Sequence, residues 1–234
     1  MAEGTPLLLL IETATTHCSV AVAKGKKIIA VKEENAPDFR HSDHLHLFIQ
    51  DCMEAAALSF GDLSGVGVSM GPGSYTGLRI GVATAKGLCF ANDIPLLAVN
   101  TLEVMAQQCH IPEGAIRLPM IDARRKEIFT LALDHQGKHI RPCSASIVDA
   151  SFKAQLPTGE KHLFGSGAEK SKSILNGADY VYHDDITVPS AVDMAPLTAE
   201  KFSTQQFEDL AYFEPYYLKD FYTTAPKIVP STSL

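Results

Sequence analysis

The first hundred residues begin with short apolar runs separated by polar residues and a glycine turn. The runs at 7–11, 19–24 and 27–33 have the composition of strands, and Gly25 stands between the last two. The continuous run LLLLI at 7–11 suits a strand that is buried on both faces. Two strands that meet at a glycine favour an antiparallel hairpin. The pattern therefore predicts three antiparallel strands at the start of the chain.

The hydrophobic period changes between residues 43 and 58. Apolar side chains there recur three and four positions apart, which indicates an amphipathic helix with Ser42 as its N-cap. The apolar positions are Leu45, Phe48, Ile49, Cys52, Met53 and Ala56.

Strands and helices alternate after this helix. The pattern predicts a strand at 65–70, a helix at 75–91, a strand at 96–99 and a helix at 101–109. Alternation of this kind requires parallel crossovers and gives a mixed sheet. The order β-β-β-α-β-α-β-α is that of a ribonuclease-H-like module, the unit that is duplicated in the actin-like ATPase superfamily.

The second half of the chain repeats this pattern in a weaker form. Two strand-like runs meet within 116–134, a strand and a glycine turn follow in 161–170, and Pro and Gly interrupt the chain at 109–114. We therefore expect an α/β protein of two ribonuclease-H-like modules with mixed sheets. The expected modules are 1–108, which carries the candidate partner-binding helices, and a smaller 109–234, whose C-terminal tail could return to the first module.

Composition and charge narrow the class of protein. The chain has 234 residues, 46% of them hydrophobic, and a formal net charge of −7, so it has no general basic face for binding nucleic acid by itself. No apolar stretch is long enough to predict a membrane span. The five cysteines are scattered without a C-x-x-C pair, which predicts a reducing, cytoplasmic compartment and no structural zinc.

The run GPGSYTGLRIGVATAKGL at 71–88 invites comparison with phosphate-binding loops. It is not a Walker A loop, because Gly77 is not followed by Lys and then Ser or Thr. It is not a dinucleotide fingerprint, because Thr76 stands where the third glycine belongs. A looser anion site at a helix N-terminus, with hydroxyls from Ser74, Tyr75 and Thr76, stays open.

The glycines of this run have a second possible role. Gly73, Gly77 and Gly81 are four residues apart and share one stripe of the predicted helix. A glycine inside a helix costs up to about 1 kcal/mol relative to alanine, so the stripe needs a reason. A stripe without side chains lets another backbone approach closely. The spacing favours packing within the domain and leaves packing against another chain open.

Residues 67–71 also match the pattern G-x-S-x-G. A nucleophile elbow would make Ser69 the nucleophile of a serine hydrolase. In such an elbow the serine leads directly into a helix, whereas Gly71, Pro72 and Gly73 delay the helix here. This alternative is therefore weaker than the packing role.

The remaining polar clusters are weak candidates for chemistry. His44 and His46 point about 200° apart on a helix, so they cannot share a metal ion, and His41 belongs to the cap region. Asp122 precedes two arginines, and the pattern favours a structural turn with a local ion pair over an acid/base site. Glu12 ends the first strand, where the acidic residues of actin-like kinases act.

Five segments taken together resemble the TsaB family, bacterial proteins needed for threonylcarbamoyladenosine modification of tRNA. The segments are LLLIETATTHCSVAV, HSDHLHLFI, GVGVSMGPGSYTGLRIGVATAKGL, PLLAVNTLEVMA and MIDARRKEIF, in this order. The resemblance is strong over residues 7–130. It implies a two-module actin-like fold and a non-catalytic partner of the threonylcarbamoyltransferase TsaD, joined by the ATPase TsaE.

The resemblance also implies where the partner binds. It implies contact through the glycine helix and the helix after Ser42, with a homodimer of the free chain through the same helices as a further expectation. It implies no cofactor, no membrane contact and only indirect contact with tRNA. The expected interface residues are Gly73, Tyr75, Thr76, Gly77, Arg79, Ile80, Gly81, Leu45 and Ile49.

Three positions depart from the pattern of the transferase. TsaD-like chains carry a metal-binding His-x-x-x-His where this sequence has Thr101 and Met105, and an acidic residue where it has Thr16. Neither a hydroxyl nor a thioether replaces imidazole as a ligand for such a metal. The resemblance therefore implies a scaffold and not a transferase or a peptidase. The alternative from another class is an enzyme, either a degenerate nucleotide-binding domain or a serine hydrolase that uses Ser69.

Overall fold

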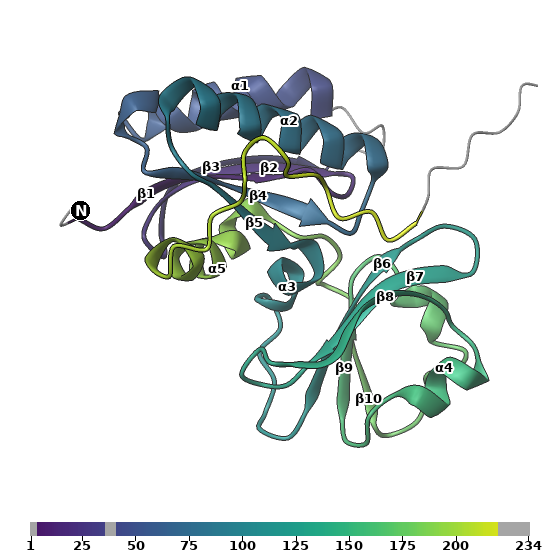
Figure 1. Cartoon of the computed structure of the whole chain (residues 1–234). Helices are drawn as coiled ribbons and strands as arrows, with labels where there is room; N and C mark the ends of the chain where they lie inside the picture. Colours follow the sequence, from purple (N-terminus) through teal and green to yellow (C-terminus); the bar gives the residue numbers. More distant parts are fainter. Residues whose placement is uncertain (1–3, 36–40, 220–234) are drawn as a thin grey trace, which may run out of the picture.

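The computed structural model describes residues 4–35 and 41–219, which form two five-stranded sheets placed one after the other along the chain (Figure 1). The first sheet has the order β3-β2-β1-β4-β5. β1 pairs antiparallel with β2 and parallel with β4, so this sheet is mixed, as predicted. Its strands are β1 (Leu7–Glu12), β2 (His17–Lys24), β3 (Lys27–Asn35), β4 (Gly65–Gly71) and β5 (Leu96–Asn100).

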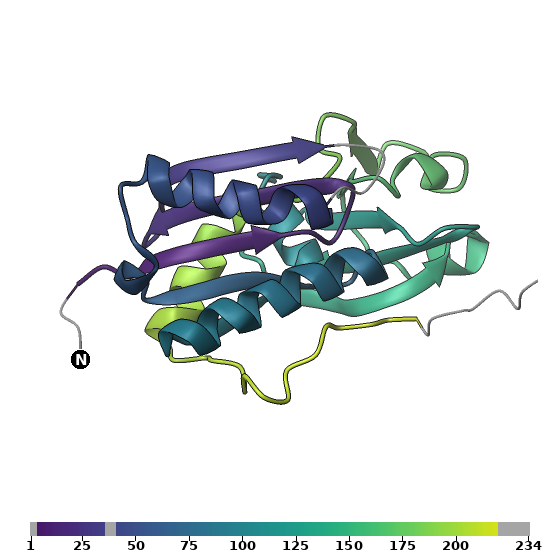
Figure 2. The ribbon, with the colours of Figure 1, turned by 90° about the horizontal axis from the view of Figure 1, so that it is seen from above.

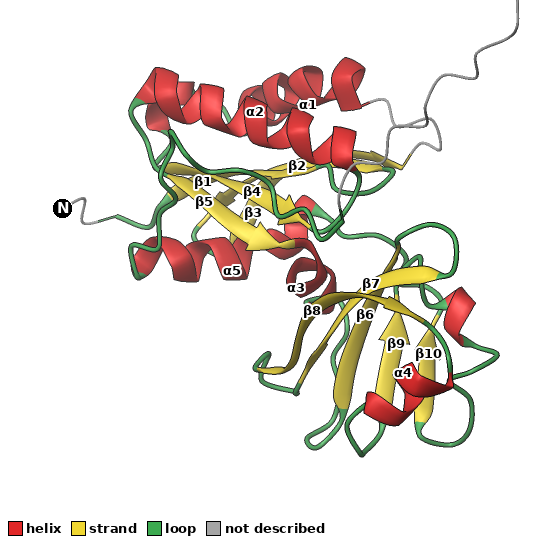
Figure 3. Ribbon diagram, turned by 45° about the vertical axis from the view of Figure 1, so that its right-hand side comes forward, coloured by secondary structure: helices red, strands yellow, loops and turns green. Residues whose placement is uncertain are grey.

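Helices cover both faces of the first sheet. α1 (His41–Ala55) and α2 (Tyr75–Asn92) lie on one face and α5 (Ala191–Ser203) on the other, as Figures 2 and 3 show. Leu9 and Ile11 of β1 belong to the core under α1 and α2, whereas Leu8 and Leu10 belong to the core under α5. The continuous apolar run of β1 is therefore explained by burial on both faces, as the sequence predicted.

The ends of α1 differ from the sequence prediction. The helix begins at His41, so Ser42 lies inside it and is not the N-cap. It ends at Ala55 and not at residue 58, because Ala57 adopts a left-handed conformation with φ 53°. The N–H of Leu58 then bonds to the carbonyl of Met53 and closes the end of the helix.

The second sheet repeats the topology of the first. Its order is β10-β9-β6-β7-β8, and β6 pairs antiparallel with β7 and parallel with β9. This repetition confirms the predicted pair of ribonuclease-H-like modules with mixed sheets. The elements are β6 (Ile116–Asp122), β7 (Glu127–Leu133), β8 (His139–Ile147), α4 (Ala150–Gln155), β9 (Lys161–Phe164) and β10 (Tyr180–His183). The helix start expected within 161–170 is only the 3-10 turn η2 (Glu169–Ser171).

The chain passes between the two sheets more than once. α3 (Thr101–Ala106) follows β5 and contacts β6, whereas α5 follows β10 and contacts β1, β2 and β5. After α5 the backbone runs beside the first sheet, where the N–H of Tyr216 bonds to the carbonyl of Met70 at 2.7 Å. The division of the chain at 108/109 stays a prediction.

The glycine stripe packs against the loop that follows β1. A Cβ added at Gly81 would lie 2.2 Å from Thr13 Oγ1, and one at Gly73 would lie 2.3 Å from the carbonyl oxygen of Ala14. The Thr13 hydroxyl also donates to the carbonyl of Gly77 at 2.8 Å. The close approach that requires these glycines is thus made by the chain's own backbone and side chains.

We predict that Gly81→Ala destabilises the protein even though alanine favours helices. The added methyl group would overlap the Thr13 hydroxyl, and overpacking of this kind costs about 1–3 kcal/mol. Urea unfolding of the purified chain measures the change. Gly87→Ala is the matched control, because a Cβ at that helix position meets nothing within 4 Å, so up to about 1 kcal/mol of stabilisation is expected. A stabilised Gly81→Ala variant would contradict the packing described for Thr13.

Candidate functional site: a buried carboxyl and the outer face of two helices

The carboxyl ends of the parallel strands β1 and β4 meet at one edge of the first sheet, where open α/β sheets commonly bind ligands. Glu12 is the last residue of β1 and is fully buried. Its Oε1 accepts a hydrogen bond from the N–H of Ala14 at 2.6 Å, whereas its Oε2 has no hydrogen-bond partner in the structure. The group is therefore a buried acid with one unsatisfied oxygen.

The environment of Glu12 favours its protonated form. Burial raises the pKa of Glu12 to about 7, and the charge of Asp193 adds to this, while hydrogen bonds from Ala14 and Ser69 act in the opposite direction. Burial also raises the pKa of Asp193 to about 6. The edge thus holds carboxyl groups that are neutral for part of the time near neutral pH.

Ser69 does not form a nucleophile elbow. It lies inside β4, which continues to Gly71, and its side chain is 1% exposed. Its hydroxyl is 2.7 Å from the hydroxyl of Thr101, which is buried as well. A nucleophilic serine must be exposed at a strand-to-helix turn, so the geometry does not support the serine hydrolase alternative.

The two positions that resemble the histidine pair of the transferase are part of the core. Thr101 and Met105 are both fully buried. Thr101 is hydrogen-bonded to Ser69, and the Met105 methyl group would lie 2.7 Å from a Cβ at Gly165. These neutral side chains fill the space by packing and hydrogen bonding among themselves.

The start of α2 is occupied by the chain itself. The Oγ of Ser74 caps the helix by accepting from the N–H of Gly77, and the N–H of Ser74 bonds to the carbonyl of Ala14. The Tyr75 ring packs on Tyr217 of the C-terminal segment, with ring centroids 4.6 Å apart. An anion at this helix terminus would have to compete with these contacts, so the geometry does not favour the phosphate role left open by the sequence.

The other polar clusters have structural partners. Nδ1 of His44 lies 2.6 Å from a carboxylate oxygen of Glu34, while His46 is exposed on the outer face of α1. The side chain of His41 lies outside the described residues. Asp122 holds the β6–β7 turn by accepting from the N–H of Arg124, and it forms an ion pair with Lys170 instead of with the neighbouring arginines.

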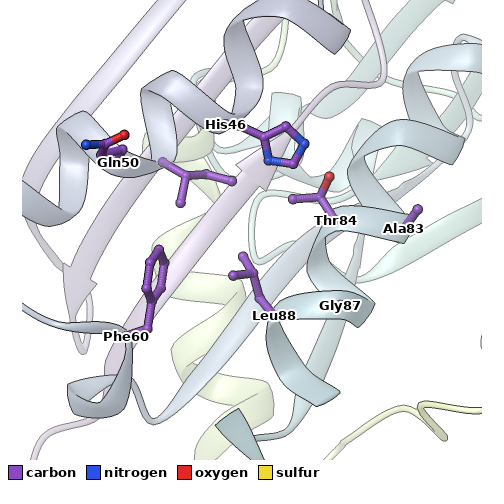
Figure 4. Close-up of a pocket in the computed structure, with 8 residues that line it drawn as sticks. His46, Gln50, Phe60, Ala83, Thr84, Gly87 and Leu88 are labelled. Atoms are coloured by element: carbon purple, nitrogen blue, oxygen red, sulfur yellow. The ribbon is translucent and has the colours of Figure 1, made fainter. Parts of the chain in front are cut away.

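A groove of about 750 Å³ runs between α1 and α2 on the side away from the sheet (Figure 4). Its lining is mostly apolar, and His46, Gln50 and Thr84 contribute polar side chains. Phe60, from the 3-10 turn η1 (Phe60–Asp62), closes one end and is 39% exposed. The lining residues are His46, Ile49, Gln50, Phe60, Ala83, Thr84, Gly87 and Leu88.

The expected interface residues divide into buried and accessible sets. Leu45 and Ile49 belong to the core, with 0% and 3% exposure, although Ile49 also lines the groove. Gly73, Gly77 and Gly81 contact the loop after β1 of their own chain, and their role at a partner interface stays a prediction. Thr76 and Arg79 are exposed, and Tyr75 and Ile80 are half-buried, so these four form the accessible set. The sequence analysis did not single out four of the groove residues, namely Phe60, Thr84, Gly87 and Leu88. The signal in the sequence was Gly87, a helix glycine that does not belong to the stripe of Gly73, Gly77 and Gly81.

Comparison with known proteins identifies the family. The model of the family described as TsaD, tRNA N6-adenosine threonylcarbamoyltransferase, matches residues 36–229. The chain belongs to the TsaD family. It is 29% identical to the tRNA threonylcarbamoyladenosine biosynthesis protein TsaB of Escherichia coli, over 91% of this chain and 94% of that protein. It is 36% identical to TsaB of Bacillus subtilis over 53% of each chain. These matches confirm the resemblance to TsaB within the family.

A solved structure supports the fold. YeaZ from Pseudomonas aeruginosa superimposes with a TM-score of 0.76 and 24% identity, over 91% of this chain and the whole of that one. Within residues 4–35 and 41–219, no helix has the length and apolar character needed to cross a membrane.

We predict that Glu12→Gln stabilises the protein above pH 7. Since the folded pKa of Glu12 is about 7 and its ordinary value is 4.5, the folded state binds more protons than the unfolded state between these values. Stability attributable to Glu12 therefore falls as pH rises through this window, by up to about 3 kcal/mol, and glutamine removes the loss. Urea unfolding at pH values on both sides of 7 measures it. Asp193→Asn removes the second carboxyl with a raised pKa and shows how much of the pH dependence of stability belongs to that group. If stability depends on pH as strongly in Glu12→Gln as in the unmodified chain, the prediction is wrong.

Proposed function

We propose that this chain is a non-catalytic partner of a TsaD-like threonylcarbamoyltransferase in the biosynthesis of tRNA threonylcarbamoyladenosine. It binds the transferase through the outer face of α1 and α2. The names of its TsaB relatives support the pathway, and the groove between the two helices supports the mode of action. The alternative of an enzyme loses support because Ser69 and Thr101 are buried against each other.

Gly87 is the observation that carries the proposal. It lies well inside α2, where glycine costs about 1 kcal/mol relative to alanine. Its own chain gives no reason for this cost, because a Cβ there would meet nothing within 4 Å. Gly81 of the same helix does have such a reason in Thr13. A glycine that lines an open groove without an internal reason is explained by the close approach of a helix from another molecule.

The surface around the groove has the chemistry of a protein interface. Phe90 of α2 is 82% exposed and Leu47 of α1 is 58% exposed. Together with Phe60 they add apolar area to the two helices that line the groove. Clustered apolar side chains with a polar rim, here His46 and Gln50, are typical of interaction sites on soluble proteins.

The occupant is a second two-module chain of the same family. Such a chain offers an equivalent helix pair on its first sheet, and two amphipathic helix pairs can pack face to face. A homodimer of the free chain would use the same face, so dimer and transferase complex exclude each other. A TsaE-like ATPase binds the complex, tRNA is contacted only indirectly, and the assembly works in the cytoplasm.

The proposed lack of catalysis follows from the buried edge of the first sheet. Thr101 and Met105 offer no strong metal ligand, and both are enclosed in the core. The chain acts by stabilising the active form of the transferase and supplies no reacting group.

We predict that Gly87→Arg abolishes the complex with the TsaD-like protein of the same organism. The long side chain would fill the groove that the partner helix must enter, while the exposed position leaves the fold intact. Size-exclusion chromatography with light scattering, on each chain alone and on the mixture, measures a 1:1 complex. The same variant should convert any homodimer of the free chain into a monomer.

Two matched variants make this test specific. Gly87→Ala should weaken the complex without abolishing it, because its methyl group opposes the close approach of the partner helix but is much smaller than the arginine side chain. Val192→Arg places the same charge on α5, on the opposite face of the sheet, and should leave the complex unchanged. A complex that survives Gly87→Arg would show that the groove is not the binding surface.

A further inference from the structure

Three side chains that are distant in sequence meet beside the second sheet. Cys109 lies in the connection between α3 and β6, His162 lies in β9, and His183 is the last residue of β10. One ligand atom from each lies within 4.8 Å of the other two. Within the described residues, this is the group of three or more histidine, cysteine or carboxylate side chains whose ligand atoms lie close enough together to hold a metal ion.

A hydrogen bond within the cluster places one ring nitrogen of each histidine opposite the other. Nδ1 of His162 is 2.8 Å from Nε2 of His183, and the two rings stack with centroids 5.1 Å apart. Nε2 of His162 is 2.8 Å from a carboxylate oxygen of Glu160. Because a carboxylate accepts the proton of Nε2, the lone pair of His162 is placed on Nδ1, toward the cluster. A carboxylate behind the ring is typical of a metal-ligating histidine.

We propose that Cys109, His162 and His183 bind a zinc ion, with the fourth position of the tetrahedron open to water. A thiolate with two imidazoles is a ligand set that zinc prefers. Tetrahedral zinc needs its ligand atoms about 3.3–3.7 Å apart, given bonds of about 2.0 Å to nitrogen and 2.3 Å to sulfur. The two ring nitrogens are 2.8 Å apart and the three ligand atoms all lie within 4.8 Å of one another, so small side-chain shifts bring them to these values.

The binding step balances without any further reactant. His162 keeps its proton on Nε2 toward Glu160 and offers Nδ1. His183 moves its ring proton from Nε2 to Nδ1 and offers Nε2. The Cys109 thiol releases its proton to solvent and binds through sulfur, as thiolate ligands do.

The surroundings allow an ion to enter and be held. Cys109 and His162 are buried, while His183 is half-buried and opens the cluster to solvent. Asp185 lies close enough for its charge to act on the Cys109 thiol, and it favours a cation. The Arg117 guanidinium also lies near Cys109, but it donates to the carbonyl oxygens of Ala106 and Asp134 and is held by them.

A bound zinc ion would join segments that are otherwise held by packing. It would tie the connection after α3 to β9 and β10, and so fix the second sheet relative to the segment that enters it from the first. This inference is independent of the proposed function, because the cluster is on the second sheet and the partner groove is on the first.

The experiment measures zinc binding by the full-length chain after metal has been removed with a chelator. Calorimetric titration with zinc should show one site, and substitution with cobalt(II) should give the absorption of a thiolate–cobalt bond. Cys109→Ser should abolish this absorption and weaken zinc binding by about 100-fold or more. Glu160→Gln, behind His162, should weaken zinc binding by about 10- to 100-fold.

Matched variants and a fold check keep the test decisive. Cys143→Ser removes another cysteine on the second sheet, outside the cluster, and should bind zinc like the unmodified chain. His183→Gln keeps a hydrogen-bonding side chain toward His162 and should lose the site while circular dichroism stays unchanged. The proposal is overturned if the unmodified chain binds no stoichiometric zinc. It is also overturned if the folded Cys109→Ser and His183→Gln variants bind zinc as tightly as the control.

Discussion

The packing of α2 on the loop after β1 determines which face of α2 is open to other molecules. Gly81 and Gly73 leave no side chain between the helix and Thr13 and Ala14, and the Thr13 hydroxyl bonds to the helix backbone. This contact fixes the rotation of α2 about its own axis. Gly87 lies about 120° around the helix from Gly81, and it is thereby directed into the groove beside α1. An intramolecular constraint thus creates the surface that we propose for the partner.

The interior edge of the same sheet is filled by neutral side chains. The hydroxyl groups of Ser69 and Thr101 share a hydrogen bond, and Met105 fills the neighbouring core. Among Glu12, Ser69, Thr101 and Met105, Glu12 is the residue that keeps a polar atom without a hydrogen-bond partner in the described structure, and a buried group of this kind reduces stability. Neutral, well-packed residues stabilise a fold without supplying metal ligands or a nucleophile, which agrees with the binding role that we propose.

Most of the fold could be predicted from the sequence because the elements of the first sheet are short apolar runs or have helical spacing, and turn residues separate them. The apolar run of β1 and the helical spacing of α1 each have one structural solution. The direction of the glycine stripe could not be predicted, since close approach requires the same small residues whether the neighbour is Thr13 or another chain. Leu45 and Ile49 were expected at the interface but are buried in the core. Their helical spacing indicated burial, and only the resemblance to a family pointed to an interface.

The cluster of Cys109, His162 and His183 could not be predicted from the sequence for a different reason. Rules based on cysteine and histidine spacing detect ligands that come from one turn or hairpin. Here the parallel pairing of β9 and β10 brings His162 and His183 together, and the connection after α3 delivers Cys109 from outside that pair. The ligands converge because the chain crosses from the first sheet to the second beside the parallel pair β9 and β10. A metal at that point would therefore act on the junction between the sheets, whereas the groove acts through the outer face of the first sheet. The two proposed sites use different parts of one fold, and each is formed by residues that only the tertiary structure brings together.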